Sequence, residues 1–411
     1  MIEHSVDVAV IGGGPAGLAA AVSARENGAK DALILDRNSW LGGILPQCIH
    51  DGFGVEETGI SMTGPEYANM YTNAVKKQAI DVWNETMVLE FNKKLEITAV
   101  NKKGLHKIKT KSIILAMGCR EKTRWNVLIP GDRPSGIFTA GVAQAFINLY
   151  NILPGKNVVI LGSGDVGLIM ARRLKLEGAN VLGVVEILPY ASGLPRNVVQ
   201  CLDDYDIPMF LNHTITCIKG RGRLESVTIA QVGKNMNILP ETKQEIKCDT
   251  LLLSLGLIPE NELSKGAGIE LDNITGGPVV DQDYMTSISG VFACGNCLQV
   301  YDTVDALAVG AKHAGKYAVT WKSKNDGLKV KSGKDVRYVV PQKITKKGTT
   351  RFTLRVEKSM QNVTFYVKSG GDEIFKKKLR WVNPANMVEI NVDISDKMIN
   401  SKKDLEVSID G

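Results

Sequence analysis

The chain has 411 residues, of which 44% are hydrophobic and 23% are charged, and a chain of this length forms roughly two to four domains. Its composition is unlike that of disordered proteins, and no apolar run reaches the about 18 residues that predict a transmembrane helix. The N-terminal segment enters an apolar strand directly and lacks the features of a signal peptide. Seven cysteines in such a long chain do not indicate a disulfide framework. We therefore expect a reduced, cytoplasmic protein without a transmembrane segment.

The net charge of +6 is unevenly distributed. Residues 322–411 contain 20 Lys and Arg against 11 Asp and Glu, a balance of +9, whereas the rest of the chain contains 30 against 33. A basic tail favours either an acidic partner or, more commonly, a solvated surface. Its aromatic residues recur at strand spacing, which indicates packing rather than the stacking surface of a nucleic-acid-binding protein. Those residues are Phe352, Phe365, Tyr366 and Trp381.

Residues 6–37 and 156–186 share one pattern, in which an apolar strand, a glycine-rich turn, a helix and a second strand follow one another. In the first copy Gly12 permits a tight turn, Gly14 lets the backbone approach a pyrophosphate, and Gly17 lets helix and strand pack closely. The N-terminus of the helix offers free N–H groups to the phosphates. Asp36 follows Gly17 by 19 residues, the position from which an acid accepts hydrogen bonds from a ribose.

The second copy repeats this arrangement with Gly162, Gly164 and Gly167, and Glu186 again follows the last glycine by 19 residues. An acid there accepts a hydrogen bond from a ribose 2′-hydroxyl and repels a 2′-phosphate, so the sequence favours NAD(H) over NADP(H). Asp165 and Val166, at the start of the helix, are further candidate contacts of this nucleotide.

The first copy has the form GGGPAG, with Pro15 and Ala16 inside it, and is followed by the pair Gly42-Gly43. This arrangement resembles the FAD-binding unit of flavoproteins with two dinucleotide sites. The segment from Thr286 to Asn296 resembles their second FAD fingerprint, and the resemblance implies that Gly295 and Asn296 bind the flavin, although Asn296 stands where the family has Asp. It implies further FAD contacts at Arg37, Val88, Ala116, Gly118, Thr303 and Val304, and a contact of Gly256 beside the nicotinamide.

Residues 1–322 thus resemble the pyridine nucleotide-disulfide oxidoreductase superfamily. The resemblance implies an α/β protein with two Rossmann-like domains, the NAD domain being inserted in the FAD domain. The expected FAD domain comprises residues 1–117 and 258–322, and the NAD domain residues 118–257. A linker at 323–333 then leads to a small all-β, sandwich-like domain at 334–411, predicted from short strands separated by turns.

The segments GGILPQCIHDGFG and AMGCREKTR, with the β-rich tail, are similar to a bacterial subgroup. Its members are associated with anaerobic glycerol-3-phosphate dehydrogenase-type flavoproteins and with the NADH-handling subunits of opine and amino-acid dehydrogenases.

The resemblance places the two thiols of a dithiol reductase either just after the pair Gly42-Gly43 or inside the NAD domain, and this chain has no closely spaced cysteine pair at either place, which disfavours a dithiol mechanism. Cys48 and His50 follow the second glycine pair, where the resemblance places the flavin, so they are candidate catalytic residues; packing of the loop is the alternative. Cys294 and Cys297 form a CxxC inside the second FAD fingerprint, where an inert buried pair is expected. A single CxxC provides too few ligands for a metal site, and none is predicted.

The sequence therefore predicts a flavoprotein that transfers hydride between NAD(H) and FAD. Electrons would be exchanged with a partner redox protein or flavoprotein subunit, and homo-oligomers are possible. Two alternatives are a free-standing NADH oxidase or disulfide reductase, and a non-catalytic interaction subunit that retains FAD.

Overall fold

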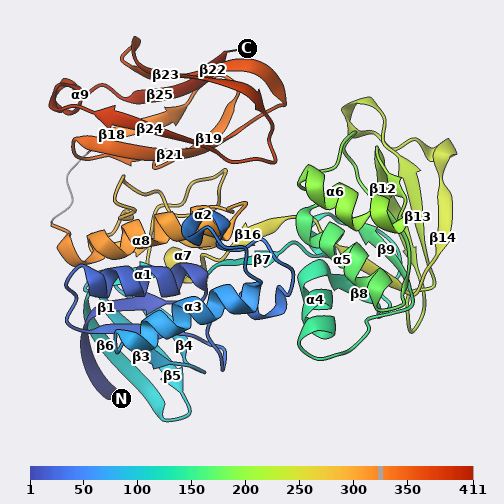
Figure 1. Cartoon of the computed structure of the whole chain (residues 1–411), viewed down its shortest axis with the longest axis horizontal. Helices are drawn as coiled ribbons and strands as arrows, with labels where there is room; N and C mark the ends of the chain where they lie inside the picture. The colour runs from blue at the N-terminus through green and yellow to red at the C-terminus, as the bar shows by residue number, and fades with distance from the viewer. Residues whose placement is uncertain (323–326, 411) are drawn as a thin grey trace. The chain divides into compact units, whose positions relative to one another are not determined.

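The structure is a computed structural model that describes residues 1–322 and 327–410 (Figure 1). It contains two compact units, one formed by Met1–Cys119 with Pro259–Gly411 and the other by Arg120–Ile258. Strands β7 (Cys119–Glu121) and β16 (Leu257–Pro259) are the two chain connections between the units. The divisions lie at 119/120 and 258/259, and the β-rich tail, which the sequence assigns to a separate domain at 334–411, is grouped with the first unit.

The first unit is built on a seven-stranded sheet in the order β3-β2-β1-β6-β5-β4, with β17 also paired to β6. Strands β3, β2, β1, β6 and β17 run parallel, whereas β6, β5 and β4 pair antiparallel. Residues 8–11 of β1 are buried on both faces, as expected for a central parallel strand. The strands are β1 (Ile2–Ile11), β2 (Ala32–Leu35), β3 (Asp81–Trp83), β4 (Met87–Phe91), β5 (Glu96–Asn101), β6 (Gly104–Leu115) and β17 (Val291–Ala293).

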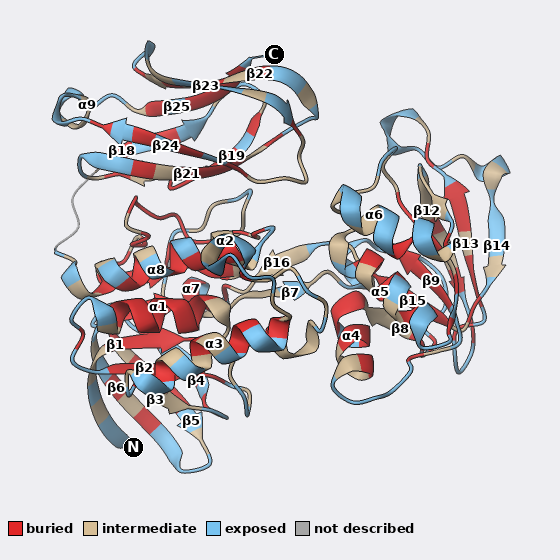
Figure 2. Ribbon diagram, viewed as in Figure 1, coloured by how far each residue is buried: buried red, intermediate tan, exposed pale blue. Residues whose placement is uncertain are grey.

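Helices α1 and α8 lie side by side against this sheet (Figure 1). They approach closely because Gly315 has no side chain: a Cβ there would lie 2.2 Å from the carbonyl oxygen of Ala20. Residues 16–24 of α1 are accordingly all buried (Figure 2). The helices of residues 1–119 and 259–322 are α1 (Pro15–Glu26), α2 (Val55–Thr58), α3 (Gly64–Lys77), α7 (Glu262–Gly266) and α8 (Val304–Thr320).

The second unit has a five-stranded parallel sheet in the order β11-β10-β9-β15-β8 and a three-stranded antiparallel sheet in the order β12-β13-β14. Its parallel strands are β8 (Ile137–Thr139), β9 (Asn157–Leu161), β10 (Asn180–Val185), β11 (Met209–Phe210) and β15 (Thr250–Leu253). The antiparallel strands are β12 (His213–Lys219), β13 (Ser226–Gln231) and β14 (Gln244–Lys247). Its helices are α4 (Ala140–Asn148), α5 (Asp165–Leu176) and α6 (Pro195–Cys201).

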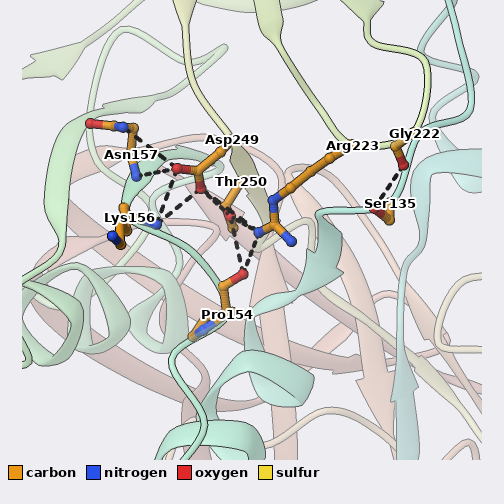
Figure 3. A network of polar contacts seen from close by, with 8 residues as sticks. All are labelled: Ser135, Pro154, Lys156, Asn157, Gly222, Arg223, Asp249 and Thr250. Carbon is orange, nitrogen blue, oxygen red and sulfur yellow. Dashed lines mark hydrogen bonds and ion pairs between the residues drawn. The ribbon is translucent and has the colours of Figure 1, made fainter.

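A polar network fixes the start of β9 against the start of β15 (Figure 3). The Asp249 carboxylate accepts hydrogen bonds from the backbone nitrogens of Lys156 and Asn157, at 3.0 and 2.9 Å, and from the Thr250 hydroxyl at 2.8 Å. Arg223 donates to the same hydroxyl. Burial opposes ionisation of Asp249, but these hydrogen bonds and Arg223 outweigh it and lower the pKa of the carboxyl.

The C-terminal part of the first unit is a β-sandwich with its own core, in which Phe352 and Phe365 are fully buried. One sheet has the order β20-β18-β25-β22-β23 and the other the order β19-β21-β24. The strands are β18 (Leu328–Ser332), β19 (Val336–Val340), β20 (Lys343–Ile344), β21 (Gly348–Val356), β22 (Met360–Ser369), β23 (Asp372–Val382), β24 (Val388–Ile394) and β25 (Leu405–Asp410), with helix α9 (Asp396–Ser401).

The predicted linker 323–333 requires a correction. Residues 328–332 form strand β18, which pairs with β25 and β20, because Leu328 and Val330 alternate with exposed lysines and enter the sandwich core. Residues 323–326 of that linker lie outside the described residues. Among the residues that are described, no helix combines the length and the apolar character needed to cross a membrane.

Candidate functional site

The first glycine turn connects β1 to α1, and its three motif glycines have different surroundings. A Cβ on Gly12 would lie 2.3 Å from the carbonyl oxygen of Ala116, and one on Gly17 would lie 1.8 Å from the carbonyl oxygen of Gly12. On Gly14 it would meet nothing closer than the Cα of Gly43, at 3.8 Å. Gly12 and Gly17 are therefore required by packing, whereas Gly14 faces the open space that a pyrophosphate would occupy.

Two distant segments join this turn. The backbone nitrogen of Gly42 donates to the carbonyl oxygen of Gly13 at 2.8 Å, which brings the second glycine pair beside the first. Gly295 has a φ of +69°, and a Cβ there would lie 2.5 Å from the Cβ of Ala16. The structure thus brings together the three segments on which the sequence resemblance depends.

Asp36 directly follows β2 and is 6% exposed. Its carboxylate accepts hydrogen bonds from the backbone nitrogens of Gly13, at 2.6 Å, and Asn38, at 2.7 Å. The Asp36 carbonyl accepts from the backbone nitrogen of Thr86, which places the segment leading to Val88 near this acid. Val88 itself is buried in β4, and Arg37 is exposed.

Asn296 lies in the 3-10 segment Gly295–Cys297. Its side-chain oxygen accepts a hydrogen bond from the backbone nitrogen of Tyr301, at 3.1 Å, and its amide donates to the sulfur of Cys119, at 3.6 Å. Thr303 caps α8, because its hydroxyl accepts from the backbone nitrogen of Ala306. Val304 begins that helix. Asn296 therefore also has a structural role, in holding the segment that leads to α8.

The second glycine turn has the same construction. A Cβ on Gly162 would lie 2.2 Å from the carbonyl oxygen of Ser254, and one on Gly167 would lie 2.7 Å from the Cβ of Ser254. On Gly164 the nearest atom would be the Ser254 hydroxyl oxygen, at 3.3 Å. Glu186 is 4% exposed, and its carboxylate accepts from the backbone nitrogens of Ser163 and Leu188, at 2.9 and 3.0 Å. The turn again packs tightly at the first and third glycines and is most open at the second.

The loop after Glu186 folds back over the start of α5. The Asp165 carboxylate accepts hydrogen bonds from the backbone nitrogen of Leu194, at 2.8 Å, and from the side-chain amide of Asn197, at 2.7 Å. Val166, the next residue of α5, is 36% exposed. Asp165 therefore holds this loop in place.

Gly118 and Gly256 lie next to the two chain connections, with φ of +73° and +86°, and a Cβ on either would have open space around it. Gly118 belongs to the first unit and Gly256 to the second.

Cys48 and His50 lie in the loop between the 3-10 segment Leu45–Gln47 and α2. The Cys48 thiol donates to the carbonyl oxygen of Ile44, and burial raises its pKa to about 12. The Cys48 carbonyl accepts from the backbone nitrogen of Gly64. His50 lies against Phe53, with ring centroids 5.0 Å apart. Since a thiolate is the reactive form, a neutral Cys48 gives no support to a nucleophilic role.

The CxxC pair is buried, with Cys294 1% and Cys297 0% exposed. Cys297 donates to the carbonyl oxygens of Leu115 and Cys294, both at 3.2 Å. Burial raises the pKa of both thiols, that of Cys297 to about 11. Both therefore behave as small apolar side chains at neutral pH.

Three supporting groups do not follow from the sequence motifs. Asp305, in the first turn of α8, accepts hydrogen bonds from the backbone nitrogens of Gly54, Glu56 and Glu57 and so caps α2. Ser163 and Ser254 support the second turn. The position of Ser163 directly after Gly162 could have indicated its bond to Glu186, but no local pattern connects Asp305 to a loop about 250 residues earlier.

Three comparisons place this geometry among known proteins. An opine oxidase subunit of Agrobacterium tumefaciens is 28% identical over 315 residues, covering 71% of this chain and 61% of that protein. NADH dehydrogenase of Bacillus subtilis is 27% identical and covers 72% and 54%. The match thus spans less than two thirds of each relative. The thioredoxin reductase structure from T. acidophilum has a TM-score of 0.62 at 24% identity and covers 77% of this chain and 98% of that one.

A model of the family described as pyridine nucleotide-disulphide oxidoreductase matches residues 6–315. The match includes both glycine turns, the acids that follow them and the segment at 286–296. The central glycines, Gly14 and Gly164, are the least crowded of each turn, which fits the dinucleotides FAD and NAD(P)H that members of this family use. The α/β fold and both glycine turns agree with this match, and the chain belongs to the pyridine nucleotide-disulphide oxidoreductase family.

Proposed function

We propose that this protein transfers hydride between NAD(H) and bound FAD and exchanges the electrons with a partner redox protein or flavoprotein subunit. The observation that carries the proposal is the duplicated glycine turn, in which a buried acid holds each turn and the central glycine is the least crowded of the three motif glycines. More specifically, the sequence resemblance implies that this partner is similar to a glycerol-3-phosphate dehydrogenase.

The chain's own contribution is to bind and align. The N–H groups at the start of α1, next to Gly14, would hold the pyrophosphate of FAD, and those of α5, next to Gly164, would hold that of NAD(H). When bound, FAD supplies the redox chemistry. We assign Cys48 and His50 to the flavin side of the site, where a neutral Cys48 thiol would donate or accept a hydrogen bond rather than attack a substrate.

The buried carboxylate of Glu186 supports the preference for NADH. Its two backbone donors, from Ser163 and Leu188, stabilise a negative charge, and that charge would repel the 2′-phosphate of NADPH.

Two observations favour a partner over a free-standing disulfide reductase. Cys294 and Cys297 are the only two cysteines that lie close together in the sequence, and both are buried and neutral. Two relatives of this chain, from opine oxidase and from the hydrogen cyanide synthase of Pseudomonas protegens, are named as subunits.

The test is anaerobic titration of the FAD-loaded protein with NADH. The proposal expects loss of the visible absorption of oxidised flavin, at lower concentrations of NADH than of NADPH. An unchanged spectrum with both nucleotides would overturn it. Rapid oxygen consumption or disulfide reduction by the isolated protein would instead favour the oxidase or reductase alternative, and FAD that no nucleotide reduces would favour the interaction subunit.

A further inference from the structure

Strand β23 is an 11-residue edge strand, since the order of its sheet ends with it and, within 1–322 and 327–410, only β22 pairs with it. An edge strand presents unpaired N–H and C=O groups, to which an extended segment of another chain can add. The two faces of such a segment must match the two faces of β23.

The outer face of β23 is basic. Lys376, Lys378 and Arg380 alternate along it and are all exposed. Lys376 lies opposite Tyr366 and Lys378 opposite Thr364, on the side of β22 that faces away from the core. An added strand would therefore present acidic side chains on this face, because opposite charges on neighbouring strands attract.

The inner face of β23 borders a partly apolar groove of about 300 Å³ between β23 and β24. Five apolar residues, Leu379, Trp381, Val382, Met387 and Val388, line it together with Lys377, Asn386 and Glu389. Trp381 is 46% exposed, although its neighbour in the sequence, Val382, belongs to the sandwich core. Lys377 crosses the gap, donating to the carbonyl oxygen of Glu389. An added strand would therefore present apolar side chains on this face.

The groove also adjoins the segment that leads into α8. The backbone nitrogen of Met387 donates to the Asp302 carboxylate at 2.6 Å, and Asp302 directly precedes Thr303, the cap of α8. A segment bound in the groove would thus lie beside the part of the chain that the resemblance assigns to FAD.

We propose that β23 and this groove dock an extended segment of the redox partner in which acidic and apolar residues alternate. A second copy of β23 is a poor occupant, because pairing would place its cations against those of the first. The inference rests on the proposed function, since it names the docking surface for the partner of that reaction.

The probe is a fluorescent ten-residue peptide that alternates Glu with Leu, added to the FAD-loaded full-length protein and followed by anisotropy. We expect binding, weakened by roughly tenfold or more in Lys376→Glu/Lys378→Glu and in Trp381→Ala, because the first change reverses the charge match and the second removes an apolar anchor. The control Lys329→Glu/Lys331→Glu makes the same charge change on β18, which is separated from β23 by other strands of the same sheet.

Absence of peptide binding would overturn the proposal, as would equal weakening in both double variants, which would show attraction by general charge alone. Equal binding of a Lys-Leu peptide, tighter binding of single-stranded oligothymidylate, or a protein dimer that Trp381→Ala dissociates would also overturn it. The peptide comparisons on the unaltered protein need no variant to fold.

Anaerobic reduction by NADH separates this inference from the proposed function. If NADH reduces the flavin but the protein does not bind the peptide, only the docking surface is refuted. If the peptide binds at β23 but NADH does not reduce the flavin, the hydride-transfer proposal is refuted.

Discussion

The carboxylate of Asp36 lies 2.6 Å from the backbone nitrogen of Gly13. The second unit repeats this relationship between Glu186 and Ser163, at 2.9 Å. In each case the acid at the end of the second strand holds the residue after the first motif glycine, and a second oxygen accepts from the backbone two residues beyond the acid. The acids therefore shape the glycine turns as well as providing acceptors for a ribose.

Gly14→Ala should weaken FAD binding by about tenfold or more, because the added methyl group would occupy the space left for the pyrophosphate. The substitution itself causes no clash, since the nearest atom lies 3.8 Å from the new Cβ. Titration of the apoprotein with FAD measures the effect. Gly266→Ala is the matched control, because its Cβ would also meet no atom within 4 Å. Unchanged affinity in Gly14→Ala would contradict the assignment of this cradle.

Glu186→Gln should reduce the discrimination against NADPH, by on the order of tenfold, because it removes the charge that opposes a 2′-phosphate. The amide keeps one oxygen, which can accept from only one of the Ser163 and Leu188 nitrogens. The ratio of kcat/KM for NADH and NADPH, with an artificial electron acceptor, is the measurement. Glu177→Gln, which alters an acid paired with Arg173 at the far end of α5, should leave the ratio unchanged. An equal change in both variants would argue against a specific role for Glu186.

Glu57→Gln should destabilise the protein by about 1–3 kcal/mol at neutral pH. Burial opposes ionisation of Glu57, but hydrogen bonds from Lys312, Tyr67 and Tyr71 outweigh it and lower the pKa of the carboxyl. A lowered pKa in the folded state stabilises the fold above the unfolded pKa of about 4.3, and this contribution is lost as the pH falls through the lower folded value. The free energies of unfolding of the two proteins, measured in urea, should therefore become more similar below about pH 4.

The control for this experiment is Glu85→Gln. Glu85 forms an exposed ion pair with Lys102 and should contribute less than about 1 kcal/mol. A difference between Glu57→Gln and the unaltered protein that stays constant from about pH 7 to about pH 3 would show that packing, rather than ionisation, is responsible.

Arg355→Leu should destabilise the first unit by about 2–3 kcal/mol, because it removes several charged hydrogen bonds at once. Arg355 pairs with Asp302 and donates to the carbonyl oxygen of Val300 and to the Tyr338 hydroxyl. Lys347→Leu breaks the exposed pair with Asp396 and should cost less than about 1 kcal/mol. Denaturant unfolding of both variants compares them, and equal losses would contradict a structural role for Arg355.

Much of the fold follows from local sequence. The glycine spacing, the apolar strands and the acids at a fixed offset predict both Rossmann-like units, because each signal lies within about 30 residues. The alternation in the tail predicts that its aromatic residues pack in the core or on the surface of strands, and Phe352 and Phe365 are buried whereas Trp381 is 46% exposed. Polar composition, by contrast, misassigns residues 328–332 to the linker, since two alternating apolar residues are enough to form an inner strand.

The supporting contacts could not be predicted, because they join residues far apart in sequence. By its position after the cap of α8, Asp305 is an ordinary acid of a first helical turn. In the structure it instead caps a different helix, α2. Arg355 resembles the other cations of a basic tail, and only the packed structure shows it paired with Asp302. The partners of such residues depend on tertiary packing, of which a single sequence gives no local sign.

The two bonds to Asp302, from Arg355 and from the Met387 backbone, have a consequence for evolution. A protein truncated before β18 would keep a carboxylate at the entrance to α8 and lose the groups that balance its charge. Descendants that discard the sandwich should therefore replace this aspartate with a neutral residue or acquire a new cation beside it, and those that retain the sandwich should change positions 302 and 355 together.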